Sequence, residues 1–335
     1  MQFKTTIDVP HSTFEISHTQ KGMAIGSCFT TNIGDRLLQT KFPILVNPLG
    51  TVYNPVSIAQ TINLLLGEIP FNEQNLFFAN DVWQSYYLHT SFSSVNKQEV
   101  LLSFNNIKKV FLEKYHFIDY LFLTLGTAWV YELIETKQIV NNCHKTPSSQ
   151  FTKRKLTVEE CVSVLEHVIT KLQKINPHLQ VIFTISPIRH WKDGAHENQV
   201  SKATLFLAID SLQKKLKNIN YFPAYELLID DLRDYRFYNN DMFHPNDMAI
   251  EYIWETFSKT YFSKETTSII SQVEAIQKAI DHRPFNTNSN SYRVFLQNTI
   301  ENCSSLLKKY SFLDLSDELS TLQKKYNESI HQNIQ

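Results

Sequence analysis

Two short segments far apart in the chain carry residue types that together perform nucleophilic chemistry. Gly26-Ser27 stands where an apolar run ends and a helical pattern begins, and Asp241 precedes His244 just before another helical pattern. A serine hydroxyl needs an adjacent base to act as a nucleophile, and an imidazole oriented by a carboxylate is a common base. The spacing of Asp241 and His244 lets one tight turn bring their side chains together. Ser27, Asp241 and His244 are therefore candidates for a catalytic triad.

Each of these residues also has a simpler structural explanation. Ser27 is placed to cap the helix that follows it, and Asp241 to cap the next turn while His244 lies at the surface. Cys28 is a competing nucleophile, since a thiolate is intrinsically stronger than a serine hydroxyl. One position after Ser27, however, we expect the thiol to point into the core under the helix. The combination of Gly-Ser with Asp-x-x-His indicates a catalytic site more specifically than either motif does alone.

The elements that must position these residues follow an α/β pattern, in which short apolar runs alternate with helical periodicity. Strands are expected at residues 23–25, 44–46, 119–125, 178–185 and 220–228, and helices at 31–40, 55–66, 96–115, 157–174, 198–219 and 245–260. Thr157 and Glu160 form a capping box at one helix start. Ser27 then lies at the carboxyl edge of a mostly parallel sheet, where open α/β folds build their sites. Its backbone amide, beside a helix N-terminus, can stabilise an oxyanion.

The C-terminal part of the chain differs in character. Residues 264–335 show only helical patterns, with faces rich in Lys and Glu and no strand signal. We therefore expect two parts, an α/β domain over residues 1–263 and an all-helical extension over residues 264–335.

Glycine usage and charge exclude two classes of ligand. The chain has seven glycines, and none of them form a G-x-G-x-x-G fingerprint. Gly22 and Gly26 are followed by Ser27 rather than by the lysine of a P-loop, so no glycine-rich nucleotide site is expected. Basic and acidic residues number 32 and 33. Since there is no positive excess to bind a phosphate backbone, we expect no nucleic-acid partner.

Membrane and metal sites are also not expected. No apolar run approaches the ~18 residues that span a bilayer, and the N-terminus lacks the apolar core of a signal peptide. We therefore expect no membrane partner and a cytoplasmic location. Cys143 with the adjacent His144 does not make the tetrahedral ligand set of a zinc site, so neither a metal nor another cofactor is expected.

The segment that contains Ser27 resembles the motif of a known family. Its residues Gly26-Ser27-Cys28-Phe29-Thr30 are similar to the motif that names the GSCFA family, a bacterial branch related to the SGNH (GDSL-type) hydrolases. The similarity continues in blocks at residues 47–55, 125–131, 142–145, 186–190 and 241–245, and covers about residues 20 to 260. The order Ser, Asp, His also occurs in α/β-hydrolases, but the G-x-S-x-G elbow of those enzymes is absent.

The resemblance implies both a fold and an activity. The fold is a flavodoxin-like, SGNH-type three-layer α/β fold with a mostly parallel central sheet. The activity is hydrolysis of an O-acyl ester, with a carbohydrate or another small hydroxylated molecule as the substrate class. By position, Ser27 is the nucleophile, His244 the base and Asp241 its orienting carboxylate. Gly50 lends an oxyanion amide beside that of Ser27.

One departure from the SGNH pattern concerns the oxyanion hole. Where typical SGNH enzymes have Gly-x-Asn, this chain has Gly126-Thr127-Ala128 and no asparagine. Loss of one such donor costs on the order of 3 kcal/mol. The side chains of Asn54, His89 and His190 are candidate replacements.

The sequence does not decide which residues bind the substrate, or whether the domain hydrolyses an ester, transfers an acyl group or only binds. Arg189 and His190, after another strand, are candidates to bind an anionic or hydroxyl-rich group. A sugar hydroxyl in place of water would make the same triad an acyltransferase. The missing asparagine also allows a degenerate domain that binds a glycan or a protein without turnover.

Overall fold

A computed structural model describes residues 5–331 of the chain, which is built around a central parallel sheet. Its five strands run in the order β10-β9-β5-β1-β2. Their bounds are β1 (Gly22–Gly26), β2 (Ile44–Val46), β5 (Tyr120–Leu125), β9 (Gln180–Ile185) and β10 (Ile219–Tyr221). All neighbouring pairs are parallel. In order of appearance these strands read 2-1-3-4-5, which is the flavodoxin-like order of doubly wound folds.

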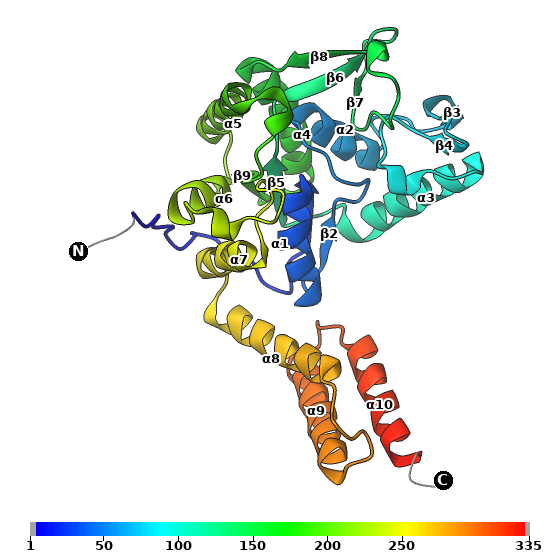
Figure 1. The fold of residues 1–335 in the computed structure, drawn as a ribbon, viewed down its shortest axis with the longest axis vertical. Coiled ribbons are helices and arrows are strands. Elements are labelled where there is room, and N and C mark those ends of the chain that lie inside the picture. The colour runs from blue at the N-terminus through cyan, green and yellow to red at the C-terminus, as the bar shows by residue number, and fades with distance from the viewer. Residues whose placement is uncertain (1–4, 332–335) are drawn as a thin grey trace. The chain divides into compact units, whose positions relative to one another are not determined.

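Helices cover both faces of this sheet, which makes a three-layer α/β fold and confirms the predicted fold class (Figure 1). Their bounds are α1 (Cys28–Gln39), α2 (Pro55–Leu66), α3 (Lys97–Val110), α4 (Val158–Ile175), α5 (Ala195–Lys215), α6 (Ala224–Glu226) and α7 (Asp247–Tyr261). Met23, Leu123 and Phe183 lie on one face, in a buried cluster with the apolar residues of α2, α4 and α5. On the other face Phe122 packs edge-on against Phe257 of α7.

Local signals at helix ends account for several of these bounds. The Thr157 hydroxyl accepts a hydrogen bond from the Glu160 N–H, and the Glu160 carboxylate accepts one from the Thr157 N–H, so the predicted capping box is confirmed. Helix α2 begins at Pro55, whose missing N–H costs nothing at a helix start. It ends at Leu66, and Gly67 after it caps the helix in the left-handed conformation.

Two smaller sheets were not predicted. One is the hairpin of β3 (Phe77–Ala79) and β4 (Val82–Gln84), which lies beside α3 in Figure 1. The other is an antiparallel sheet in the order β7-β6-β8, whose strands are β6 (Trp129–Leu133), β7 (Ile139–Val140) and β8 (Phe151–Lys155). These strands are two to five residues long and mostly half-buried, so their apolar runs are too short to indicate strands on their own.

The last predicted strand, at residues 220–228, is wrong beyond its beginning. Strand β10 ends at Tyr221, and after Pro223 the chain turns into α6 and a helical turn over Leu227–Asp231. Leu227 and Leu228 are buried there in helical conformation. A short apolar run does not distinguish a buried strand from a buried helical turn.

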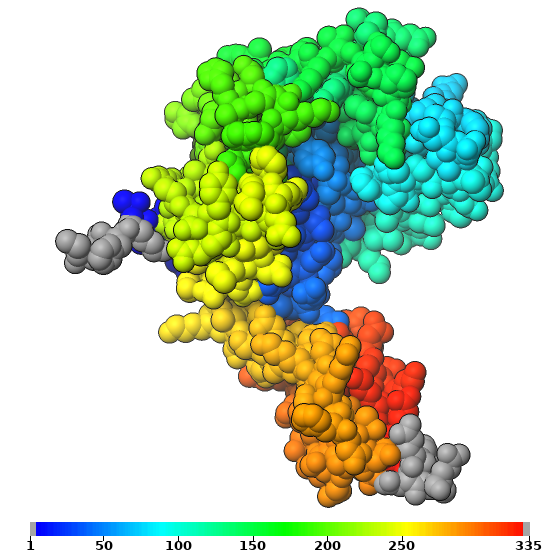
Figure 2. Space-filling model, in the orientation of Figure 1, coloured from blue at the N-terminus to red at the C-terminus, as the bar shows by residue number. Residues whose placement is uncertain are grey.

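The chain divides into two compact units, and the sheet belongs to the first, which includes Lys21–Asp35 and Ile44–Thr260. The second unit contains α8 (Lys264–Asp281), α9 (Asn290–Lys309) and α10 (Ser316–His331), coloured yellow-orange to red in Figure 1 and Figure 2. These helices share a core that includes Val273, Leu296 and Leu322, so the helical character predicted for this region is confirmed.

The second unit also takes in Ser12–Gln20 and Arg36–Pro43. The ring of His18 stacks on Phe42 with centroids 4.0 Å apart, and Lys41 pairs with the buried Glu318 of α10 at 2.6 Å. Across residues 5–331, every helix is too short or too polar to traverse a bilayer.

Candidate functional site

A cavity of about 470 Å³ lies where β1, β5 and β9 end. Its lining comes from residues 27–28, 126–127, 186 and 188–192, together with Tyr53, Phe243 and His244. The order of the sheet reverses at β1, since the chain steps from β1 outward to β2 and then returns to β5. Ligands of open α/β folds bind at such a switch point, outside the carboxyl ends of the strands. The cavity is therefore in the position where this fold places a site.

Ser27 forms the junction between β1 and α1 and is 2% exposed. Its N–H donates to Thr124 O at 3.3 Å, and its hydroxyl oxygen accepts from the Phe29 N–H at 3.3 Å. Gly26 before it has φ +153°, and a Cβ at that position would lie 2.3 Å from Thr124 O. Only glycine lets β1 turn into α1 this close to β5, which fixes the serine at the strand end.

Cys28 lines the same cavity, whereas the sequence predicted that its side chain would point into the core. Burial raises the pKa of the Cys28 thiol. The thiol form therefore dominates at neutral pH, and a thiol is a much weaker nucleophile than a thiolate.

Asp241 and His244 are in direct contact, with Oδ2 and Nδ1 2.5 Å apart. The other carboxylate oxygen accepts the backbone N–H groups of His244 and Phe243, each at 2.9 Å. These two backbone hydrogen bonds, with the contact to the imidazole, lower the pKa of Asp241 to about 2. Met242 closes the turn with φ +63°. The carboxylate is thus ionised at neutral pH and holds the ring with Nδ1 toward it.

Ser27 and His244 both line the cavity, but among residues 5–331 no hydrogen bond joins the serine hydroxyl to the imidazole. Ser27 is buried at a strand end, whereas the side chain of His244 is 47% exposed on its turn. Catalytic hydrogen bonds are often long without substrate and tighten in the complex. The structure brings the two residues to one cavity without joining them.

The predicted oxyanion donors are mostly engaged elsewhere. The Gly50 N–H donates to Asn47 O at 2.8 Å within a turn. The N–H groups of Gly126 and Thr127 both donate to Tyr53 O, at 2.7 and 2.9 Å. Gly126 lines the cavity and Gly50 does not. The amide protons expected from Ser27 and Gly50 are therefore both already used, by Thr124 O and Asn47 O.

Two candidate replacements for the missing asparagine also lie outside the cavity lining. Asn54 caps α2 and accepts the Ser57 N–H at 2.9 Å. His89 is exposed and accepts the Ser91 N–H at the start of a short helical turn. Of the predicted site residues, the cavity is lined by Ser27, Gly126, Arg189, His190 and His244.

Arg189 lines the cavity and also binds the turn that carries His244. Its Nη2 donates to Met242 O at 2.7 Å, and its guanidinium lies 5.2 to 5.7 Å from the ring centroids of Trp191, Tyr238 and Phe243. These distances are in the range of cation–π contacts. Next to it, burial lowers the pKa of His190, which favours a neutral ring in the cavity wall.

Two family models match the chain. The GSCFA family matches residues 21–257, and the C-terminal domain of GSCFA domain proteins matches residues 273–328. The chain belongs to the GSCFA family. The first match contains the whole central sheet and every residue that lines the cavity, and the second falls within the C-terminal helices. A comparison with curated proteins gave no match.

In this GSCFA protein one residue that binds the cavity wall from behind was missed by sequence reasoning as a functional candidate. Lys202 of α5 is 1% exposed, and its Nζ donates to Gly126 O at 2.9 Å and to Ser186 O at 2.7 Å. Burial lowers the pKa of Lys202 to about 7. A signal was present, because Lys202 shares helical spacing with the buried Leu205 and Ile209. A lysine in such a stripe is not part of a solvated face.

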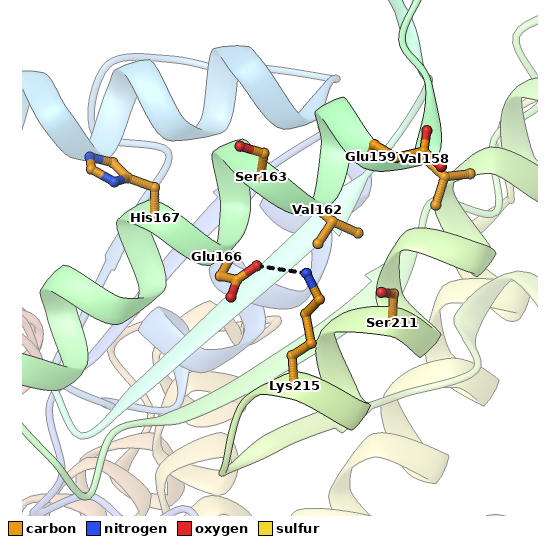
Figure 3. A pocket seen from close by; sticks show the side chains of 8 residues that line it. All are labelled: Val158, Glu159, Val162, Ser163, Glu166, His167, Ser211 and Lys215. Atoms are coloured by element: carbon orange, nitrogen blue, oxygen red, sulfur yellow. Dashed lines mark hydrogen bonds and ion pairs between the residues drawn. The ribbon is translucent and has the colours of Figure 1, made fainter.

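A second cavity of the GSCFA protein, of about 480 Å³, lies between α4 and α5 (Figure 3). Two of its charged groups form an ion pair, in which Lys215 binds Glu166 at 3.1 Å. Its lining comes from these two helices alone and includes no strand end. In the part of the chain that the structure describes, no group of three or more His, Cys, Asp or Glu is placed to hold a metal ion. The cavity at the strand ends is therefore the candidate active site.

Proposed function

We propose that this GSCFA protein is a serine hydrolase of the SGNH type that cleaves an O-acyl ester. The observation that carries the proposal is the contact of Asp241 with His244 at the rim of the cavity that also contains Ser27. A nucleophile, a base and a carboxylate that orients the base are the parts that acyl transfer requires.

The protonation of the pair determines the role of each atom. Asp241 is ionised at neutral pH, so its carboxylate accepts the proton on His244 Nδ1. This leaves Nε2 to take the proton of the Ser27 hydroxyl as that oxygen attacks the acyl carbon. His244 then passes the proton to the leaving alkoxide, and water repeats the sequence to release the acid.

Negative charge develops on the acyl oxygen during this attack. Ser27 directly precedes α1, and the N-terminus of a helix favours negative charge. In this proposal His244 moves toward Ser27 when the substrate binds. The movement is assigned to His244 because the turn that carries it is exposed.

The cavity supports a small ester as the substrate. Its volume of about 470 Å³ is within the range of small-molecule sites. Tyr53, Trp191 and Phe243 supply aromatic surface, and Arg189 and Lys192 supply positive charge. Aromatic faces with polar groups suit an acylated carbohydrate or another small hydroxylated molecule.

A fluorophosphonate, which reacts preferentially with activated serines, tests the proposal. We expect one adduct on wild-type protein, located at Ser27 by mass spectrometry and lost in Ser27→Ala. Ser163→Ala, in the cavity between α4 and α5, is the matched control and keeps the label. No adduct on the folded wild type, or an adduct that persists in Ser27→Ala, contradicts the proposal. An adduct on Cys28 makes the thiol the nucleophile.

The second candidate is binding of a glycan or protein without turnover. It is favoured by the absent Ser27–His244 hydrogen bond and by the engaged amides of Gly50, Gly126 and Thr127. The same labelling separates the two, since a binding domain leaves the fluorophosphonate unreacted. If labelling succeeds, product analysis with and without an added sugar distinguishes a hydrolase from an acyltransferase.

A further inference from the structure

Lys202 is a buried ammonium group whose two hydrogen bonds both end on main-chain atoms of the cavity wall. Gly126 follows β5 and Ser186 follows β9, and each offers its carbonyl oxygen to Nζ. Among residues 5–331 no carboxylate forms an ion pair with Lys202. The side chain thus joins the ends of two neighbouring strands beside Ser27.

A cation in this position is costly for the fold. Burial of a charge without an opposite charge is strongly unfavourable, and an apolar residue of similar volume is often more stable there. Leu205 and Ile209 on the same face of α5 are apolar, so methionine at position 202 would extend their stripe. The core does not require a lysine at position 202, so a role in the site at the strand ends explains why Lys202 is there.

The groups around Lys202 leave its charge uncompensated. They are the Cys28 thiol on α1, the His190 ring after β9 and the Tyr225 ring of α6, which lies 5.6 Å from Nζ. Burial raises the pKa of both Cys28 and Tyr225 and lowers the pKa of His190. All three are therefore neutral near pH 7, and the field of the ammonium reaches the cavity.

We propose that Lys202 is a positioning residue of the esterase site, which holds the ends of β5 and β9 together and places positive charge behind the cavity wall. This inference rests on the proposed function. The charge favours the oxyanion that forms when Ser27 attacks, because fixed charges act strongly where water is excluded. Lys202 acts through the main chain and through its field, without contact with the substrate.

The pH dependence of the reaction provides a readout that a purely structural role does not change. Since burial lowers the pKa of Lys202 to about 7, the ammonium loses its proton as the pH rises through that value. The deprotonated amine supplies no field, so the rate falls there. Arginine stays charged throughout this range, and methionine is never charged.

The experiment measures hydrolysis of p-nitrophenyl acetate on both sides of pH 7 by wild type, Lys202→Met, Lys202→Arg and Lys214→Met. Lys214 is an exposed lysine of the same helix, paired with Asp210, and serves as the matched control. We expect kcat of Lys202→Met to fall about tenfold or more below pH 7 with little change in KM. The alkaline decrease of wild type and Lys214→Met should be absent in both Lys202 variants, and Lys202→Arg should keep more activity than Lys202→Met.

Three results overturn the inference. One is wild-type kcat in a folded Lys202→Met, another is an alkaline decrease that persists in both Lys202 variants, and the third is a wild-type rate that does not fall above pH 7. The third result is measured on wild type, so it tests the inference even if neither variant folds. Failure of the proposed function looks different, because Ser27 of the wild type then takes no fluorophosphonate label. When wild type is labelled at Ser27, any of the three results overturns only the inference.

Discussion

The guanidinium of Arg189 donates a 2.7 Å hydrogen bond to the main-chain oxygen of Met242. This contact joins the loop after β9 to the turn in which Asp241 orients His244. Met242 itself adopts a left-handed conformation in that turn, which is uncommon for a residue with a side chain. Arg189 therefore supports the conformation that presents the imidazole, in addition to lining the cavity.

Replacement of Arg189 by methionine should lower kcat. The variant keeps apolar contact with Trp191 and Phe243 but loses the hydrogen bond to Met242, so His244 is held less well. A small displacement of a catalytic group costs roughly ten- to hundredfold in rate. Ester hydrolysis by Arg189→Met measures the effect, and thermal unfolding shows whether the fold is retained. A raised KM with unchanged kcat would instead indicate that Arg189 binds the substrate directly.

Replacement of Asp241 by asparagine should reduce kcat by a factor on the order of 10²–10⁴. An asparagine amide allows the ring of His244 to adopt the wrong tautomer and does not stabilise the imidazolium. Fluorophosphonate labelling of Ser27 should slow by a similar factor while the near-UV circular dichroism stays unchanged. Labelling at the wild-type rate would show that Asp241 only caps its turn.

The pH dependence of the hydrolysis rate also tests the pair of Asp241 and His244. The pKa of Asp241 is lowered to about 2, so this carboxylate stays ionised through mildly acidic conditions. Any acid limb of the wild-type rate therefore reports protonation of another group. A limb that disappears in Asp241→Asn while the rate remains measurable would contradict this assignment.

Gly50→Ala should destabilise the fold, since Gly50 has φ +95° and a Cβ there would lie 2.0 Å from the Cβ of His89. Backbone strain and overpacking each cost about 1–3 kcal/mol. Gly194→Ala is the matched control, because φ is +85° but nothing lies within 4 Å of its Cβ. We expect urea denaturation to show a clearly larger loss for Gly50→Ala. Equal losses would mean that His89 moves aside without cost.

Sequence patterns were sufficient where structure depends on near neighbours. Helix α2 begins at Pro55 and ends before Gly67, and α4 begins at the capping box of Thr157 and Glu160, as the residues predict. The parallel strands β5 and β9 also follow from their apolar runs. Periodicity and capping are local properties, so a single sequence carries them.

Relations between distant segments were not accessible in the same way. The Gly126 amide is used by Tyr53, 73 positions earlier, because a loop folds back on the end of β5, whereas the Gly50 amide is used by Asn47 within a local turn. Whether an amide proton is free is a property of that tertiary contact. Helical spacing places Lys202 on a buried face of α5, but its partners are the carbonyl groups of Gly126 and Ser186, which no side-chain pattern reveals.

Lys202 should also leave a signature in the pH dependence of stability. Burial lowers its pKa from 10.5 to about 7. Between these values the unfolded chain binds a proton that the folded chain does not, so this group makes the free energy of unfolding rise with pH. The cost of the buried charge is fully present below pH 7 and vanishes above the unfolded pKa.

Lys202→Met removes this contribution. The difference in the free energy of unfolding between variant and wild type should shift in favour of the variant as the pH falls from 10.5 to 7, by up to about 1.4 kcal/mol per pH unit. Methionine also leaves the carbonyl groups of Gly126 and Ser186 without a donor, which costs stability at every pH. The slope is therefore the quantity to measure, by urea denaturation across this range, with Lys214→Met as the control. Parallel curves for wild type and Lys202→Met would mean that the ammonium keeps its usual pKa in the folded protein.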